Sequence, residues 1–255
     1  MQKNRIILAA MTALVIAGTA LAAPQVYAAA KTSPAETAIQ VAAKQNRYAV
    51  VTFYKQKDAA STKMLAEVKK LQGKHSKKAT FVNVDVDNKV HANVIAKYDA
   101  DRAPMPLTLV IAPNGAVTAG YPNEIKKTDL SDDFVSKGMA DVLKVLQSGK
   151  LAAICVQNSK TKHNQESLDA AKGLRSDKRL ADLVVIVTVD PSDKDESKFM
   201  QLCKADANSA EAQLVVIVPP GRIVGKFNGA ASKDTVLASV IKSCSSGGCG
   251  PSGCN

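Results

Sequence analysis

The sequence predicts an α/β protein that is built from two copies of one domain. Stretches such as Leu183–Val189 and Leu214–Val218 are continuously apolar, which is typical of strands in a sheet that helices cover on both faces. Short motifs also recur at one offset of about 105 residues, which indicates a tandem duplication. The matching pairs are Asn83–Asp85 with Thr188–Asp190, and Val110–Gly115 with Val216–Gly221.

Residues 1–28 are expected to be a secretory signal peptide. Two cations precede an apolar run from Ile6 to Ala23, and small residues suited to cleavage stand at Ala22 and Ala28. The run is short and rich in Ala and Gly, which disfavours a transmembrane anchor. We therefore expect a periplasmic or secreted protein, in an oxidising space, with no stable membrane insertion after cleavage.

About 225 residues remain, which is enough for two domains of roughly 110 residues each. We expect these domains at 33–148 and 150–243, followed by a tail at 244–255. In the first domain the patterns predict helices at 35–45, 58–72, 88–98 and 133–147, strands at 48–54 and 79–84, and a hairpin from Leu107. In the second they predict strands at 151–157 and 183–189, helices at 165–174, 196–204 and 233–242, and a hairpin at 213–227.

The hairpin of the first domain begins directly after Pro106. This proline cannot donate a ladder hydrogen bond, so it has to lie at the beginning of the strand, and an X-Pro bond is the type in which a cis peptide is accessible. A hairpin entered in this way, after two β-α units, resembles the end of a thioredoxin fold. The resemblance implies two tandem thioredoxin-like domains, each with a mixed central sheet, helices on both faces and, in the first, a cis-proline beside the redox position.

The residues of that redox position are missing from the first domain. Thioredoxins carry Cys-x-x-Cys at the start of the helix that follows the strand at 48–54, and this chain has no cysteine there. Setting Lys63-Met64 against the Lys-Met that often follows the motif puts Ala59 and Thr62 in place of the two thiols. Neither side chain supplies the thiolate that disulfide exchange requires. Dithiol catalysis is therefore not expected at this position.

The second domain lacks the dithiol as well, and Ala212 takes the position of Pro106. The chain is therefore expected to be a non-catalytic binding or scaffolding protein with a protein or peptide as its partner. The resemblance implies that the groove beside the cis-proline can hold an extended peptide by backbone hydrogen bonds. Met105 and Pro106 are then the expected contact residues.

The five cysteines fall into two groups. Cys155 lies in an apolar strand and Cys203 on the apolar side of a helix, so both are expected to be small buried side chains. A disulfide between these two stays open, because both belong to the second domain. Cys244, Cys249 and Cys254 recur every five residues in a Gly/Ser/Pro segment that is expected to be flexible and has no apolar side chain to bury.

Three interpretations of this tail compete. Its thiolates can be soft ligands for Cu(I) or Zn(II), the only cofactors that the sequence suggests. Alternatively, two of the thiols form a disulfide and the third exchanges, which would make the chain a thiol-disulfide oxidoreductase through its tail. The third interpretation is a disordered end whose cysteines simply oxidise.

Other classes of function find little support in the sequence. The formal net charge of +11 favours acidic partners or anionic surfaces. The basic run Lys69–Lys78 spans a helix end, where cations interact favourably with the dipole, and export argues against a nucleic-acid partner. His75, His91 and His163 have no carboxylates at ligand spacing, and no phosphate loop or nucleophile elbow occurs.

Overall fold

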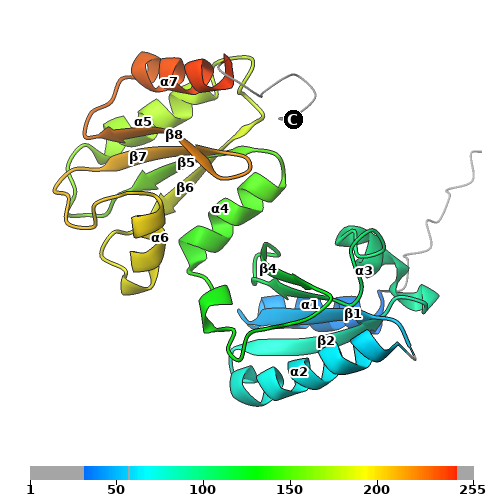
Figure 1. Cartoon of the computed structure of the whole chain (residues 1–255). Helices are drawn as coiled ribbons and strands as arrows, with labels where there is room; N and C mark the ends of the chain where they lie inside the picture. The colour runs from blue at the N-terminus through cyan, green and yellow to red at the C-terminus, as the bar shows by residue number, and fades with distance from the viewer. Residues whose placement is uncertain (1–31, 57, 246–255) are drawn as a thin grey trace, which may run out of the picture. The chain divides into compact units, whose positions relative to one another are not determined.

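The computed structural model describes residues 32–56 and 58–245, with side chains described as far as residue 242 (Figure 1). The predicted signal peptide, Cys249 and Cys254 lie outside the described residues, so the predictions for them stay predictions. Within the described part of the chain, no helix is both long and apolar enough to cross a membrane.

The first sheet has four strands in the order β2-β1-β3-β4. Its strands are β1 (Tyr48–Tyr54), β2 (Ala79–Asp85), β3 (Leu107–Ile111) and β4 (Val117–Pro122). β1 pairs in parallel with β2, whereas β3 runs antiparallel to both β1 and β4. The sheet is therefore mixed, and its two central strands are buried along nearly their whole length.

The second sheet repeats this arrangement in the order β6-β5-β7-β8. Its strands are β5 (Leu151–Val156), β6 (Val184–Val189), β7 (Gln213–Val218) and β8 (Arg222–Asn228). β5 is parallel to β6, and β7 is antiparallel to β5 and β8. The same strand order and strand pairing occur twice, so the predicted fold of two tandem thioredoxin-like domains is confirmed.

Helices cover both faces of the first sheet. Its helices are α1 (Pro34–Lys44), α2 (Ala59–His75) and α3 (Ala92–Lys97), the last preceded by the 3-10 turn η1 (Lys89–His91). α1 and α3 bury apolar side chains against Phe53 on one face, and α2 places Met64 and Val68 on the other. Local capping fixes where these helices begin, because Ser33 accepts a hydrogen bond from the N–H of Glu36 and Asp58 accepts one from the N–H of Ser61.

Four helices and a 3-10 turn surround the second sheet. These are α4 (Lys137–Gln147), α5 (Asn164–Leu174), η3 (Lys194–Glu196), α6 (Ser197–Leu202) and α7 (Lys233–Ser245). α5 and α7 pack on the face that holds Cys155, whereas α4 and α6 pack on the face that holds Ile154. α7 reaches Ser245, so the backbone of Cys244 belongs to its last turn rather than to a tail.

Helix α4 packs on the second sheet. The sequence suggests a helix at 133–147 that closes the first domain. In the structure Ala140 of α4 does pack with Ala112 and Ala116. Val142 and Val145, however, join the apolar cluster of Ile154 and Phe199. Figure 1 shows α4 beside the second sheet. α4 thus has the place on the second sheet that α1 has on the first. An amphipathic stripe predicts that a helix buries one side, but it does not say against which sheet.

The loop between Pro122 and α4 covers the α2 face of the first sheet. Ile125, Leu130 and Phe134 pack there with Met64. The N–H of Leu130 donates to Nε2 of His75 over 3.1 Å, which fastens the loop to the end of α2. This segment, which includes the 3-10 turn η2 (Ser131–Asp133), fills the place that α7 takes on the second sheet.

Candidate functional site: the edge beside Pro106

The candidate site lies where β1 and β2 end and β3 begins. The Met105–Pro106 peptide bond is cis, and Leu107 opens β3 directly after it. A shallow pocket of about 350 Å³ adjoins this bond. Its wall combines apolar and charged side chains, namely Val86, Ile95, Ala103 and Met105 with Lys55, Asp87 and Asp101.

The start of α2 borders this region, and its polar groups are occupied in capping. The Asp58 carboxylate accepts a 2.7 Å hydrogen bond from the N–H of Ser61, and the Thr62 hydroxyl donates to the C=O of Asp58 over 3.0 Å. Hydrogen bonds from Ser61 lower the pKa of Asp58 below its usual value. Ala59 is the first residue of the helix, so the two positions aligned with the thiols carry a methyl group and a hydroxyl engaged in the cap.

Some backbone groups beside Pro106 are unpaired. Within the described residues, the C=O of Pro104 and the N–H and C=O of Met105 have no hydrogen-bond partner. The C=O of Pro106 is already used, because it accepts a 2.7 Å hydrogen bond from the N–H of Asn123. Unpaired backbone groups at the end of a strand are the groups that an added extended segment can bind.

In the second thioredoxin-like domain, which we call the second module as we call the other the first, the chain itself pairs with the backbone around Ala212, the counterpart of Pro106. The N–H of Lys162 donates to the C=O of Ala210 over 2.9 Å, and the N–H of Ala212 donates to the C=O of Lys162 over 2.8 Å. Lys162 thereby forms an isolated parallel bridge with Glu211. The Ser209 hydroxyl binds both the N–H and the C=O of Glu211. We call residues 158–163, which run across this edge, the strap.

The two buried cysteines lie on opposite faces of the second sheet. Cys155 belongs to the cluster beneath α5 and α7, and Cys203 belongs to the cluster beneath α4 and α6. Both are free thiols, so the disulfide between them that the sequence left open does not form. Burial raises the pKa of Cys155 to about 11 and that of Cys203 to about 12, the latter with a contribution from the charge of Glu196. Both side chains are therefore protonated at neutral pH and poor nucleophiles.

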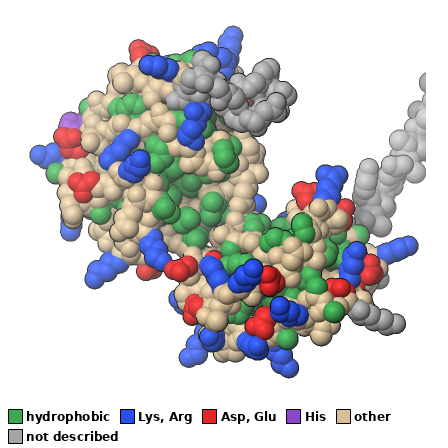
Figure 2. All heavy atoms as spheres, viewed as in Figure 1, with side chains coloured by type: hydrophobic (Ala, Val, Ile, Leu, Met, Phe, Trp, Pro, Cys, Tyr) green, Lys and Arg blue, Asp and Glu red, His purple; other side chains and the backbone are tan. Residues whose placement is uncertain are grey.

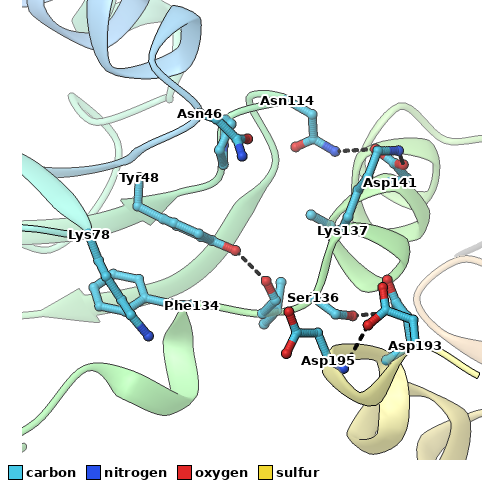
Figure 3. Close-up of a pocket in the computed structure, with 14 residues that line it drawn as sticks. Asn46, Tyr48, Lys78, Asn114, Phe134, Ser136, Lys137, Asp141, Asp193 and Asp195 are labelled. Carbon is cyan, nitrogen blue, oxygen red and sulfur yellow. Dashed lines mark hydrogen bonds and ion pairs between the residues drawn. The ribbon is translucent and has the colours of Figure 1, made fainter.

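A second hollow, of about 460 Å³, lies beside Tyr48, Ser136 and Asp193 (Figure 3). Its polar groups largely bind one another. The Tyr48 hydroxyl donates to the C=O of Val135 over 2.6 Å, and the Ser136 hydroxyl donates to Glu196 over 2.5 Å. Burial also raises the pKa of Tyr48 to about 12. These pairings indicate a structural role for the hollow.

The described residues offer no group of three or more His, Cys, Asp or Glu side chains that could hold a metal ion. His75 is buried against Phe134 and binds the backbone of Leu130. On the face shown in Figure 2, Lys and Arg side chains are dispersed among acidic ones and form no single basic patch. The lysines of the run Lys69–Lys78 are all exposed, in agreement with the expectation that this run is a solvated surface.

Comparison with solved structures finds thioredoxin-fold proteins. The germline-specific thioredoxin Deadhead of Drosophila melanogaster is 22% identical over 36% of this chain and 82% of that chain, with a TM-score of 0.30. The zinc-bound form of human ERp44 is 12% identical over 80% of this chain and 57% of that chain, with a TM-score of 0.33. The first two thioredoxin domains of Saccharomyces cerevisiae Eps1p are 12% identical over 77% of this chain and 92% of that chain, with a TM-score of 0.26.

No protein-family model matches the sequence, and comparison with curated proteins finds no match. The fold of this chain is therefore defined by its own strand order, strand pairing and internal duplication.

Proposed function

We propose that this chain is an exported, non-catalytic binding protein that holds an extended polypeptide segment at the edge beside Pro106. One observation carries the proposal: the backbone groups of Pro104 and Met105 have no partner among the described residues, whereas the duplicated groups of the second module are all paired. The N–H and C=O of one extended residue point to the same side, so a polypeptide on that side can bind both groups of Met105. The C=O of Pro104 points the other way, because the bond from Pro104 to Met105 is trans.

The pocket wall indicates which side chains such a segment carries. Met105, Val86 and Ile95 offer an apolar surface of the size that one aliphatic side chain fills. Asp87 and Asp101 on the rim outnumber Lys55, so a cation beside the apolar residue is favoured. The preferred ligand is therefore an extended segment with an aliphatic residue next to Lys or Arg.

A binding role without covalent chemistry follows from the absence of cysteine between residues 32 and 154 in the sequence. The Ser61 hydroxyl accepts a hydrogen bond from the N–H of Lys55, and the Thr62 hydroxyl donates to the C=O of Asp58. Export rests on the apolar segment at 6–23, which the sequence predicts to be part of a signal peptide.

Amide chemical shifts of the ¹⁵N-labelled protein, titrated with the peptide acetyl-Ala-Ser-Lys-Leu-Ser-Ala-amide, test the proposal. We expect saturable shifts at Met105, Ala103 and Lys55, with a dissociation constant on the order of 0.1–1 mM, as for a short peptide that has to be ordered on binding. A peptide in which Asp replaces Lys is the control and should bind more weakly. Absence of shifts at Met105, or shifts confined to other parts of the chain, would contradict the proposal.

The regular spacing of Cys244, Cys249 and Cys254 favours a second candidate function. In this alternative the tail binds Cu(I) or Zn(II), or exchanges disulfides, and the two modules carry it. Deletion of residues 244–255 separates the two candidates. Peptide binding at Met105 is expected to survive the deletion, whereas stoichiometric metal uptake under reducing conditions is expected only in the complete chain.

A further inference from the structure

The strap lies on the second module in the manner of a bound ligand. Its residue Lys162 uses its N–H and its C=O to pair with Ala210 and Ala212, on either side of Glu211. Glu211 and Ala212 stand directly before β7, as Met105 and Pro106 stand directly before β3. The strap therefore pairs with the second module at the duplicated position, on the side to which the C=O of Ala210 and the N–H of Ala212 point.

We infer that Ala210–Ala212 is a latent second binding edge for an extended polypeptide segment, which the strap keeps occupied. The inference deepens the proposed function, because it places a second binding edge at the duplicated position, where the N–H of Ala212 supplies a donor that Pro106 lacks. It implies that the protein takes up one segment while the strap is in place. A second segment binds only after the strap has left the edge.

The way the strap is held makes it displaceable. None of the side chains from Ser159 to His163 is buried, so no apolar anchor ties the strap to the core. Its attachment to the edge consists of the two hydrogen bonds of Lys162. Segments with few buried contacts open far more readily than core strands do.

Backbone strain also favours release of the strap. His163 has φ of 61° in the left-handed region, which is costly for a residue with a β-carbon. It stands at the N-cap position of α5 without a side-chain hydrogen bond to the helix backbone. Departure of the strap from the edge would allow His163 to return to an ordinary backbone conformation.

Two side chains of the strap hold its present shape, namely Asn158, whose amide donates to Oδ1 of Asp190 over 2.8 Å, and Thr161. The Thr161 hydroxyl accepts a 2.9 Å hydrogen bond from the N–H of Asn158 and lies 2.6 Å from Oδ1 of Asn164, to which it can donate. Thr161→Val removes these bonds at nearly constant volume, whereas Thr161→Ser retains the hydroxyl. Thr161→Val therefore loosens the strap and Thr161→Ser preserves it, and neither variant changes the residues of the edge.

Hydrogen exchange of the ¹⁵N-labelled full chain provides the first readout. In Thr161→Val we expect the amides of Lys162 and Ala212 to exchange about tenfold faster than in the wild type. Thr161→Ser should match the wild type, and the amide of Val215 in β7 should be unaffected in both. Unchanged exchange at Lys162 and Ala212 in Thr161→Val would overturn the inference.

Binding of a copy of the strap provides the second readout. The probe is the peptide acetyl-Gln-Asn-Ser-Lys-Thr-Lys-amide, which reproduces residues 157–162. We expect a saturable shift of the Ala212 amide in Thr161→Val and at least fivefold weaker binding there in the wild type, where the attached strap competes. Faster exchange without a shift at Ala212 would overturn the latent edge.

The same titration keeps the two proposals apart. A shift at Met105 without one at Ala212 in Thr161→Val overturns the latent edge and leaves the proposed function standing. A shift at Ala212 supports the latent edge. If neither this probe nor the leucine peptide, acetyl-Ala-Ser-Lys-Leu-Ser-Ala-amide, shifts Met105, the proposed function is contradicted.

Discussion

The carboxylate of Glu196 accepts a 2.7 Å hydrogen bond from the backbone N–H of Gly138, which is 58 positions away in the sequence. It also accepts a hydrogen bond from the hydroxyl of Ser136, the N-cap residue of α4. The first N–H groups of a helix have no partner inside the helix, and the positive end of the helix dipole favours a negative charge there. A buried carboxylate from η3 thus fastens the helix α4 to the second module.

Gly138→Ala is expected to destabilise the protein. A Cβ at this position would lie 2.7 Å from Oε2 of Glu196, which is too close, so the carboxylate would have to shift and its hydrogen bonds at the N-terminus of α4 would be disturbed. We expect a loss of about 1–3 kcal/mol in the free energy of unfolding, measured by urea denaturation. Gly73→Ala in α2 is the matched control. A Cβ there meets no atom within 4 Å, so helix propensity should raise stability by up to about 1 kcal/mol. Equal effects of the two substitutions would contradict the proposed role of Glu196.

Asp133→Asn is expected to loosen the loop that closes the first module. The Asp133 carboxylate is buried and binds the Tyr121 hydroxyl at 2.5 Å and Nζ of Lys127 at 2.8 Å. Removing its charge leaves Lys127 without its partner, so we expect a loss of about 1–3 kcal/mol in the free energy of unfolding. Asp132→Asn is the control, because Asp132 and its partner Lys198 are both more than three quarters exposed. That change should stay within about 0.5 kcal/mol.

The repeat and the fold could be predicted from the sequence, because continuous apolar strands and the proline before the hairpin are local signals. The sheet on which α4 packs could not be predicted. Its apolar stripe satisfies either sheet, and only the packing of Val142 and Val145 with Ile154 shows which sheet it covers. The closing loop at 123–135 gives no periodic pattern either, since it holds its place through single contacts such as that of Leu130 with His75.

The candidate site was also only partly predictable. Met105, Pro106 and the cis bond between them follow from the resemblance, and the structure adds the pocket beside this bond. The residues of the strap themselves give no sequence signal, because its pairing uses only the backbone of Lys162 and its side chains are exposed or half-buried. The loss of proline at Ala212 was the single hint, since an alanine can donate the N–H that this pairing needs.

Exchanging the residues before the two duplicated positions tests which module binds. Met105→Glu gives the first module the residue that the second has at Glu211, and it removes apolar surface from the pocket. We expect at least fivefold weaker binding of the leucine peptide, or about 1 kcal/mol, in an anisotropy titration with a fluorescent derivative. Glu211→Met is the control and should leave the affinity unchanged, because the strap covers that edge. If Glu211→Met weakened binding as much as Met105→Glu, the site would not be confined to the first module.

The buried thiols predict a loss of stability in alkali. Cys155 and Cys203 have pKa values of about 11 and about 12 in the folded protein, above the ordinary 9.0. The raised pKa values favour the protonated form of both thiols in the folded state. The stability that these thiols contribute is therefore complete below pH 9 and is lost as the pH rises toward 11 and 12. Once the unfolded thiols ionise, the free energy of unfolding should fall by about 1.4 kcal/mol per pH unit for each thiol.

Urea denaturation under a reducing agent at pH 8, 9 and 10 measures this slope. The double variant Cys155→Ala, Cys203→Ala should begin less stable and show a flatter slope, because the tyrosines and the tail titrate alike in both proteins. Parallel slopes would mean that water reaches these thiols in the folded state.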